Sequence, residues 1–258
     1  LTIRGGNFTG GINTVKNDLF GVLTINGGNF SNTAQYVIMN WNKAEITAGT
    51  FQTLDTASAV LFTSSYGADA NTIGKLSISG GEFKHASDTQ EMIVDHYDES
   101  NKGNAVVTGG KFDADISKYI PTDYVQSADG TVEKLGETNA VAKVGGTYYK
   151  TLADAVAAAQ DGDTITLLKD AELTSTLNLA KNITIDGQGK YTIKAANSFT
   201  VGSDNKTYCV LYVSGEVTLK DVTVNGNEKC RVIFCDKGKL TIDGATITNG
   251  KAPNFIGG

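Results

Sequence analysis

Three charged side chains recur at one position of a strand motif near the C-terminus. Asp186, Lys220 and Asp243 follow the short strands ITI, VTL and LTI, which predicts one outward column, with Asp221 and Arg231 nearby in the sequence. A hydrolase uses two or three close Asp residues as acid and base on a sugar polymer. A lyase uses carboxylates to hold Ca²⁺ against an acidic sugar and an Arg or Lys as the base. A charge-alternating structural ladder explains the pattern equally simply, and we favour it because two of the aspartates stand in ITIDG and LTIDG turns.

A second group of acids lies in the sequence DHYDES, where Asp95, Asp98 and Glu99 surround His96. Carboxylate oxygens are the ligands that Ca²⁺ prefers, but this spacing matches no calcium loop. We therefore expect a solvated loop and no cofactor, with a Ca²⁺ ion bound by these carboxylates as the alternative.

Three aromatic residues are candidates for binding a sugar ring. Trp41 stands in the polar stretch MNWNKA. Tyr66 and Tyr97 lie in SSYGADANT and YDESNKGN, polar stretches that we expect to form loops inserted into the repeat. An exposed ring combines an apolar face with a polar edge, which suits stacking on a sugar. The alternative for Trp41 is that its ring folds over the edge of a coil.

The three cysteines, Cys209, Cys230 and Cys235, are too few for a disulfide framework. The repeat predicts equivalent positions in neighbouring strands for Cys209 and Cys230, where one bridge and two reduced thiols are both compatible with the spacing. Zinc is not expected, because neither His85 nor His96 lies near them in the sequence.

An internal repeat predicts the elements that position these residues. The string LTIRGGNF begins at Leu1 and recurs as LTINGGNF, AEITAGTF, LSISGGEF and AVVTGGKF, with successive starts 22, 21, 32 and 29 residues apart. Each copy is a period-2 strand followed by glycines and an aromatic residue. We expect the chain to leave the strand at the glycines, with positive φ there. Second strands follow as YVIM, AVLF and EMIV.

Equivalent residues one coil apart should stack in columns, because neighbouring parallel strands lie about 4.8 Å apart. The predicted internal columns are Ile3, Ile25, Ile46, Ile78 and Val107, and beside them Phe8, Phe30, Phe51, Phe83 and Phe112. The corresponding outward positions hold Arg4, Asn26, Thr47, Ser79 and Thr108. This outward strip has no carboxylate pair, so we expect no catalysis on it.

The pattern changes after the fifth copy. The stretch KFDADISKYIPTDYV predicts a terminal cap, and Asp-Gly at 129–130 and Gly-Gly at 145–146 predict hairpins. The sequence TLADAVAAAQDGD predicts a short helix with Thr151 as its N-cap and Gly162 at its end. A second strand series follows, with DTITLL, NITIDG, VTLKDVTV and LTIDGATI.

These patterns predict an all-β fold: a right-handed parallel β-helix, a solenoid, in two tandem segments with a short capping helix between them. We expect residues 1–126 to end a first β-helix with its terminal cap, residues 127–140 to form a linker or hairpin, and residues 141–258 to hold the N-terminal cap and first coils of a second β-helix. Because the chain starts and stops next to repeats, we expect a segment of a longer protein.

Composition excludes some partners. The net charge of −6, from 28 acids and 22 bases, argues against nucleic acid and anionic membranes, which both require a basic face. The sequence has no run of 18 apolar residues, so we expect no membrane insertion. We expect a monomer.

The GGxF repeat, the cap SKYIPTDYV and the stretch AVAKVGGTYYKTLADAVAAAQDGDTITLLKD, followed by NITIDGQGKYTI, resemble parts of large bacterial proteins. Those proteins carry tandem pectate-lyase-like β-helix domains and are secreted by, or attached to the wall of, Gram-positive gut-type bacteria. The resemblance covers nearly the whole chain and implies the right-handed β-helix fold and an extracellular location, at the cell surface or secreted. Its motifs are structural, so it carries fold and location rather than activity.

We therefore expect a non-catalytic surface module, either an adhesin stalk or a scaffold that binds a glycan or a host surface protein. The alternative is a fragment of a polysaccharide lyase or glycoside hydrolase that works in a groove of the β-helix with Asp186, Lys220 and Asp243. A spacer without any ligand is the third hypothesis.

Overall fold

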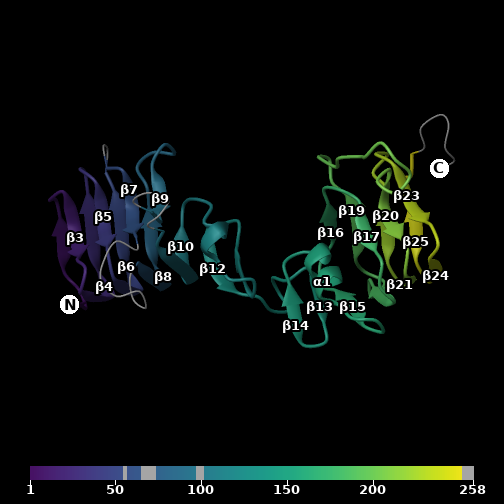
Figure 1. Cartoon of the computed structure of the whole chain (residues 1–258), viewed down its shortest axis with the longest axis horizontal. Helices are drawn as coiled ribbons and strands as arrows, with labels where there is room; N and C mark the ends of the chain where they lie inside the picture. Colours follow the sequence, from purple (N-terminus) through teal and green to yellow (C-terminus); the bar gives the residue numbers. More distant parts are fainter. Residues whose placement is uncertain (55–56, 65–73, 97–101, 252–258) are drawn as a thin grey trace. The chain divides into compact units, whose positions relative to one another are not determined.

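The computed structural model describes residues 1–54, 57–64, 74–96 and 102–251. In these residues the protein is all-β with parallel sheets, an arrangement compatible with a β-solenoid (Figure 1). The chain divides into two compact units, Leu1–Lys134 and Leu135–Gly258. Their boundary falls within residues 127–140, the range that the sequence assigns to a linker or hairpin.

The described residues of the first unit form two sheets. The larger sheet has the order β1-β4-β6-β8-β10-β12-β11, with β2 also paired to β4. Its strands are β1 (Thr2–Ile3), β2 (Asn7–Thr9), β4 (Val22–Asn32), β6 (Lys43–Thr53), β8 (Lys75–Lys84), β10 (Asn104–Phe112), β11 (Tyr124–Gln126) and β12 (Thr131–Lys134). The smaller sheet consists of β3 (Asn13–Asn17), β5 (Tyr36–Asn40), β7 (Ala59–Thr63) and β9 (Glu91–Val94), which lie side by side in Figure 1.

The predicted internal columns are confirmed. Parallel register pairs join Ile3 to Ile25, Ile25 to Ile46, Ile46 to Ile78, and Ile78 to Val107. All five side chains are buried. Equivalent residues of successive coils are therefore direct neighbours in the core, although 21 to 32 residues separate them along the chain.

The aromatic column is a continuous stack. From Phe8 to Phe112, neighbouring ring centroids lie 4.8, 4.9, 4.7 and 4.5 Å apart, and the ring planes deviate by 7° at most. Phe8, in the first coil, is half-buried, whereas the other four rings are buried. Burying one such ring contributes about 2 to 3 kcal/mol, so this column is a large part of the unit's core.

The glycines do not end the strands as the sequence predicts. β4, β6, β8 and β10 run on through them, and the register shifts beside them, between Ile25 and Asn29 for example, mark β-bulges. The second position of each pair has the predicted positive φ, as at Gly28 (114°) and Gly49 (126°). A Cβ on Gly49 would also lie 3.1 Å from the Phe51 ring and from a Gly28 oxygen. The bulge thus bends the strand while keeping its pairing with the next coil.

A buried polar ladder lies where β3, β5 and β7 end. Asn17 donates to the side chain of Asn40 at 2.7 Å, and Asn40 donates to Thr63 at 3.0 Å. Both asparagines also donate to backbone carbonyls at strand starts further along the chain: Asn17 to that of Lys43 in β6 and Asn40 to that of Lys75 in β8. The ladder satisfies backbone groups that the turns would otherwise leave unpaired inside the protein.

The first unit ends in the cap that the sequence predicts. The hairpin β11–β12 turns at Gly130, which has a φ of 88°, and β12 pairs antiparallel with the edge of β10. Ile116, the residue just before a 3₁₀ turn (η1, Ser117–Tyr119), is buried in this cap. An antiparallel strand prevents a further parallel coil from adding at this edge.

Up to residue 251, where the described part of the chain ends, the second unit has three sheets. The first has the order β14-β13-β15-β18-β21-β24, the second β16-β19-β22-β25 and the third β17-β20-β23. Their strands are β13 (Ala142–Val144), β14 (Thr147–Tyr149), β15 (Thr164–Leu167), β18 (Ile183–Asp186), β21 (Glu216–Lys220), β24 (Lys239–Asp243), β16 (Ala171–Leu173), β19 (Thr192–Ala195), β22 (Thr223–Asn225), β25 (Thr246–Thr248), β17 (Leu177–Leu179), β20 (Cys209–Val213) and β23 (Arg231–Cys235). The predicted second series is confirmed as β15, β18, β21 and β24, which pair in parallel within one sheet.

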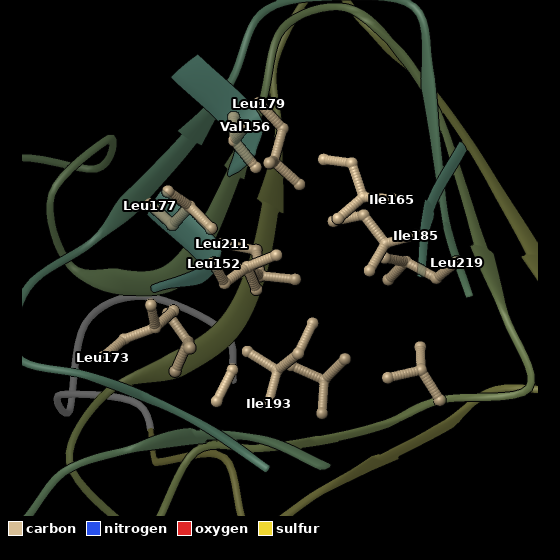
Figure 2. Packing of buried hydrophobic residues seen from close by; sticks show 14 of the residues in the cluster. Leu152, Val156, Ile165, Leu173, Leu177, Leu179, Ile185, Ile193, Leu211 and Leu219 are labelled. Carbon is tan, nitrogen blue, oxygen red and sulfur yellow. The ribbon is translucent and has the colours of Figure 1, made fainter. Parts of the chain in front are cut away.

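The predicted helix is present as α1 (Leu152–Ala158). Its N-cap Thr151 accepts the backbone N–H of Asp154 at 3.0 Å. The helix ends at Ala158, before Gly162. At this end, Lys181 donates to the carbonyls of Val156, Ala157 and Ala159. Figure 2 shows Leu152 and Val156 of α1 among the buried residues of the unit, which include Ile165, Ile185 and Leu219.

The predicted equivalence of Cys209 and Cys230 is wrong by one residue, because Arg231 is the register partner of Cys209. All three cysteines are free thiols; Cys209 and Cys230 are buried and Cys235 is exposed. Burial raises the pKa of both Cys209 and Cys230 to about 11.

Within the described residues, no helix is long and apolar enough to cross a membrane.

Replacing Phe51 by Ala should lower the free energy of unfolding by about 3 to 5 kcal/mol, because it leaves a cavity between two stacked rings. Phe20, which is 78% exposed, provides the control: Phe20→Ala should change stability by about 0.5 kcal/mol or less. Urea unfolding measures both. Equal stability of Phe51→Ala and the wild type would contradict the stack.

Thiol titration tests the cysteine environments. At about pH 8, one thiol, that of Cys235, should react quickly with a disulfide reagent in the native protein, and all three should react in denaturant. The raised pKa values of Cys209 and Cys230 do not change the free energy of unfolding below pH 9, the ordinary pKa of a thiol. As the pH rises from 9 toward 11, that free energy should fall, because these thiols ionise in the unfolded chain before they ionise in the folded one. Rapid reaction of two native thiols would contradict this arrangement.

Candidate functional site

A row of polar side chains crosses the outer face of the first unit, just after the bulges. Asn7, Asn29, Thr50 and Glu82 are register neighbours on β2, β4, β6 and β8. Asn29 donates to Asn7 at 2.8 Å, and Thr50 donates to Asn29 at 2.7 Å. Each side chain directly precedes a Phe of the stack, so the strand that builds the aromatic stack also aligns this row.

A second row, two residues further along the same strands, completes a groove. It consists of Thr9, Ser31, Gln52 and Lys84. The two rows, with Phe30 and Phe51, line a hollow of about 420 Å³. We call this hollow the amide groove.

One ion pair lies at the β8 end of the amide groove. The Nζ of Lys84 is 2.8 Å from the Oε1 of Glu82. This hydrogen bond lowers the pKa of Glu82 and raises that of Lys84, so both stay charged at neutral pH. Among the described residues that line the groove, Glu82 is the one carboxylate. Glycoside hydrolysis uses two carboxyl groups, so the lining favours binding over hydrolysis.

The outward strip predicted from the sequence is exposed at Arg4, Asn26, Thr47 and Ser79, but it lies outside the amide groove. Asn26 and Thr47, from that strip, are hydrogen-bonded to each other at 2.9 Å but do not line the groove. The residues that do line it flank the repeated Phe, in NFT, NFS, TFQ and EFK. This alternation was visible in the sequence, but the bulge that bends the strand before it was not.

In the second unit, the structure brings Asp186 and Lys220 together as register partners on β18 and β21. Lys220 Nζ lies 3.2 Å from Asp186 Oδ2, and Asp186 Oδ1 accepts the Gln188 N–H at 2.7 Å. Both carboxylate oxygens therefore have partners. The hydrogen bond to Asp186 raises the pKa of Lys220, which makes its amine a poorer base at neutral pH.

The other members of that predicted column are less closely associated. Asp243 is exposed at the end of β24, and its backbone carbonyl accepts the Asp221 N–H at 2.8 Å. Its carboxylate contributes to the raised pKa of Lys220. Arg231 is not part of this group: it lies on β23, in a different sheet, and donates to Asn205.

The expectation of an exposed Trp41 is corrected. Its side chain is buried, and its ring meets the Phe62 ring edge-on with centroids 5.0 Å apart. Trp41 thus folds over the coil, the alternative that the sequence left open, and its ring is not available for stacking on a sugar. Tyr66 and Tyr97 lie outside the described residues.

The acidic loop is held by ion pairs where the structure describes it. Asp95 lies 2.9 Å from Lys118 and 3.0 Å from His96. Burial raises the pKa of Asp95, but hydrogen bonds from these two partners outweigh it and lower the pKa. Asp98 and Glu99 lie outside the described residues. Across the described ranges, no three His, Cys, Asp or Glu side chains are grouped as a metal site requires.

Comparison of the chain with known proteins gave no match to a protein-family model, to a curated protein or to a solved structure.

Proposed function

We propose that this chain is a non-catalytic extracellular surface module that binds an uncharged glycan in the amide groove. The observation that supports this proposal is the double row of amides and hydroxyls beside the phenylalanine stack. Sugar hydroxyls donate and accept hydrogen bonds, and amide and hydroxyl side chains offer both functions. Neighbouring strands repeat the rows at about 4.8 Å, which suits a polymer that runs across the strands.

We take each unit to be a right-handed parallel β-helix. Parallel strands of one sheet joined by a crossover are right-handed in about 98% of cases. The register that repeats from coil to coil supports this reading. Stacked coils form a stiff scaffold on which a side-chain row keeps its spacing.

The extracellular location rests on the resemblance of the GGxF repeat and the caps to secreted and wall-attached bacterial β-helix proteins. The geometry also supports the absence of catalysis in this proposal. Glu82 is held in an ion pair, and the pKa of Lys220 is raised, so neither side chain is suited to act as a base.

The double variant Asn29→Ala/Thr50→Ala should weaken binding of a neutral oligosaccharide about tenfold, because it removes two hydrogen-bonding groups from the groove. The matched control is Asn26→Ala/Thr47→Ala, which removes the same hydrogen-bonded pair of residue types outside the groove. Calorimetric titration against a panel of neutral glycans measures both.

Equal loss in both variants, or no binding by the wild type to any neutral glycan, would contradict the proposal. A rise in ultraviolet absorbance from unsaturated uronides, on addition of pectin or alginate with Ca²⁺, would instead show the lyase activity of the alternative hypothesis.

A further inference from the structure

Two aromatic rings form a platform on the outer face of the second unit. Tyr212 and Phe234 are register partners on β20 and β23. Their ring centroids are 6.1 Å apart, with 19° between the ring planes. Both are half-buried, whereas Leu211, the neighbour of Tyr212 in the strand, is fully buried. The platform therefore continues the alternation of the strand on its outer side, where a ligand can reach the rings.

Two cations flank this platform. Lys206 Nζ lies 5.6 Å from the centroid of the Tyr212 ring, and Arg231 Cζ lies 4.8 Å from that of Phe234. The Lys206 side chain is exposed, and Arg231 is 6% exposed. One accessible positive charge, on Lys206, and one buried positive charge, on Arg231, therefore lie beside the two aromatic rings.

The charge of Arg231 is not compensated. Its guanidinium donates to the backbone and side-chain oxygens of Asn205, at 3.4 and 3.0 Å, and its Nε is buried without a hydrogen-bond partner. No carboxylate in the described part of the chain forms an ion pair with it. Asp204, one residue from Asn205, accepts hydrogen bonds from Thr207 and the Lys206 N–H instead. A buried charge without a counterion is costly, so an anion held at the surface above it gains affinity.

We infer that Tyr212, Phe234, Lys206 and Arg231 form a binding site for a sugar that carries a sulfate or a carboxylate. The sugar ring lies against the aromatic platform, and its anionic group lies beside Lys206 in the field of Arg231. The net charge of −6 repels polyanions at long range, so binding of this ligand must come from a local site. This site is in the other unit from the amide groove and takes a ligand of different charge.

The test measures binding of heparin oligosaccharides, oligogalacturonates and neutral dextran oligosaccharides to the full chain in EDTA. Wild-type protein should bind at least one of the two anionic probes more tightly than dextran, and binding should weaken as salt rises from roughly 50 to 500 mM. The anionic probe that binds identifies sulfate or carboxylate as the preferred group. Lys206→Ala and Arg231→Met should each weaken that binding about tenfold. The matched control is Lys190→Ala, which removes the cation 4.8 Å from the single Tyr191 ring and should leave binding unchanged.

Thermal unfolding separates a binding role of Arg231 from a structural one. Removing an uncompensated buried charge should leave Tm unchanged or raise it. A lower Tm of Arg231→Met with retained binding would overturn the inference. So would unchanged binding by Lys206→Ala, an exposed position where misfolding is not expected, or failure of the wild type to bind either anionic probe. None of these results bears on the amide groove, whose variants lie in the first unit.

Discussion

The first unit depends on direct contact between equivalent side chains of successive coils. The phenylalanine stack is its clearest expression, because ring follows ring at 4.5 to 4.9 Å, close to the spacing of paired strands. Backbone hydrogen bonds and side-chain packing therefore select the same register. A slip of one residue would turn every ring outward and every polar neighbour inward, so the core strongly disfavours it.

The outer surface follows from this core. Successive side chains of a strand point to opposite faces of the sheet. The residues before and after each buried ring therefore face outward, and in successive coils they line up as two outer rows. In the first unit the rows are mostly amides and hydroxyls, and Asn7, Asn29 and Thr50 are hydrogen-bonded in sequence along one of them. In the second unit the same rule places Asp186 opposite Lys220 and Tyr212 opposite Phe234. Surface chemistry in this protein is thus a matter of which residues occupy the outward rows.

Much of this arrangement could be predicted from the sequence, because the repeat is a periodic signal. The columns from Ile3 to Val107 and from Phe8 to Phe112 and the Thr151 N-cap are present as predicted. So are the two hairpins, β11–β12 and β13–β14. The bulge was missed because a glycine with positive φ fits a turn and a bulge equally well.

The candidate sites were less predictable. Trp41 stands in a polar stretch, yet its burial depends on Phe62, 21 residues away. The position of Arg231 opposite Cys209, rather than Cys230, depends on where a strand begins within a long interval between repeats. Local patterns do not specify such contacts. The Tyr212 and Phe234 pair becomes recognisable only when the register of β20 and β23 is known.

A double-mutant cycle between Phe51 and Phe83 tests most directly whether successive coils stack. The two rings are 32 residues apart in the sequence and 4.7 Å apart in the structure. Unfolding free energies of Phe51→Ala, Phe83→Ala and the double variant should give a coupling of about 0.5 to 1.5 kcal/mol. Additive effects, with a coupling below about 0.3 kcal/mol, would contradict the stacking of coils on which the rest of the structure depends.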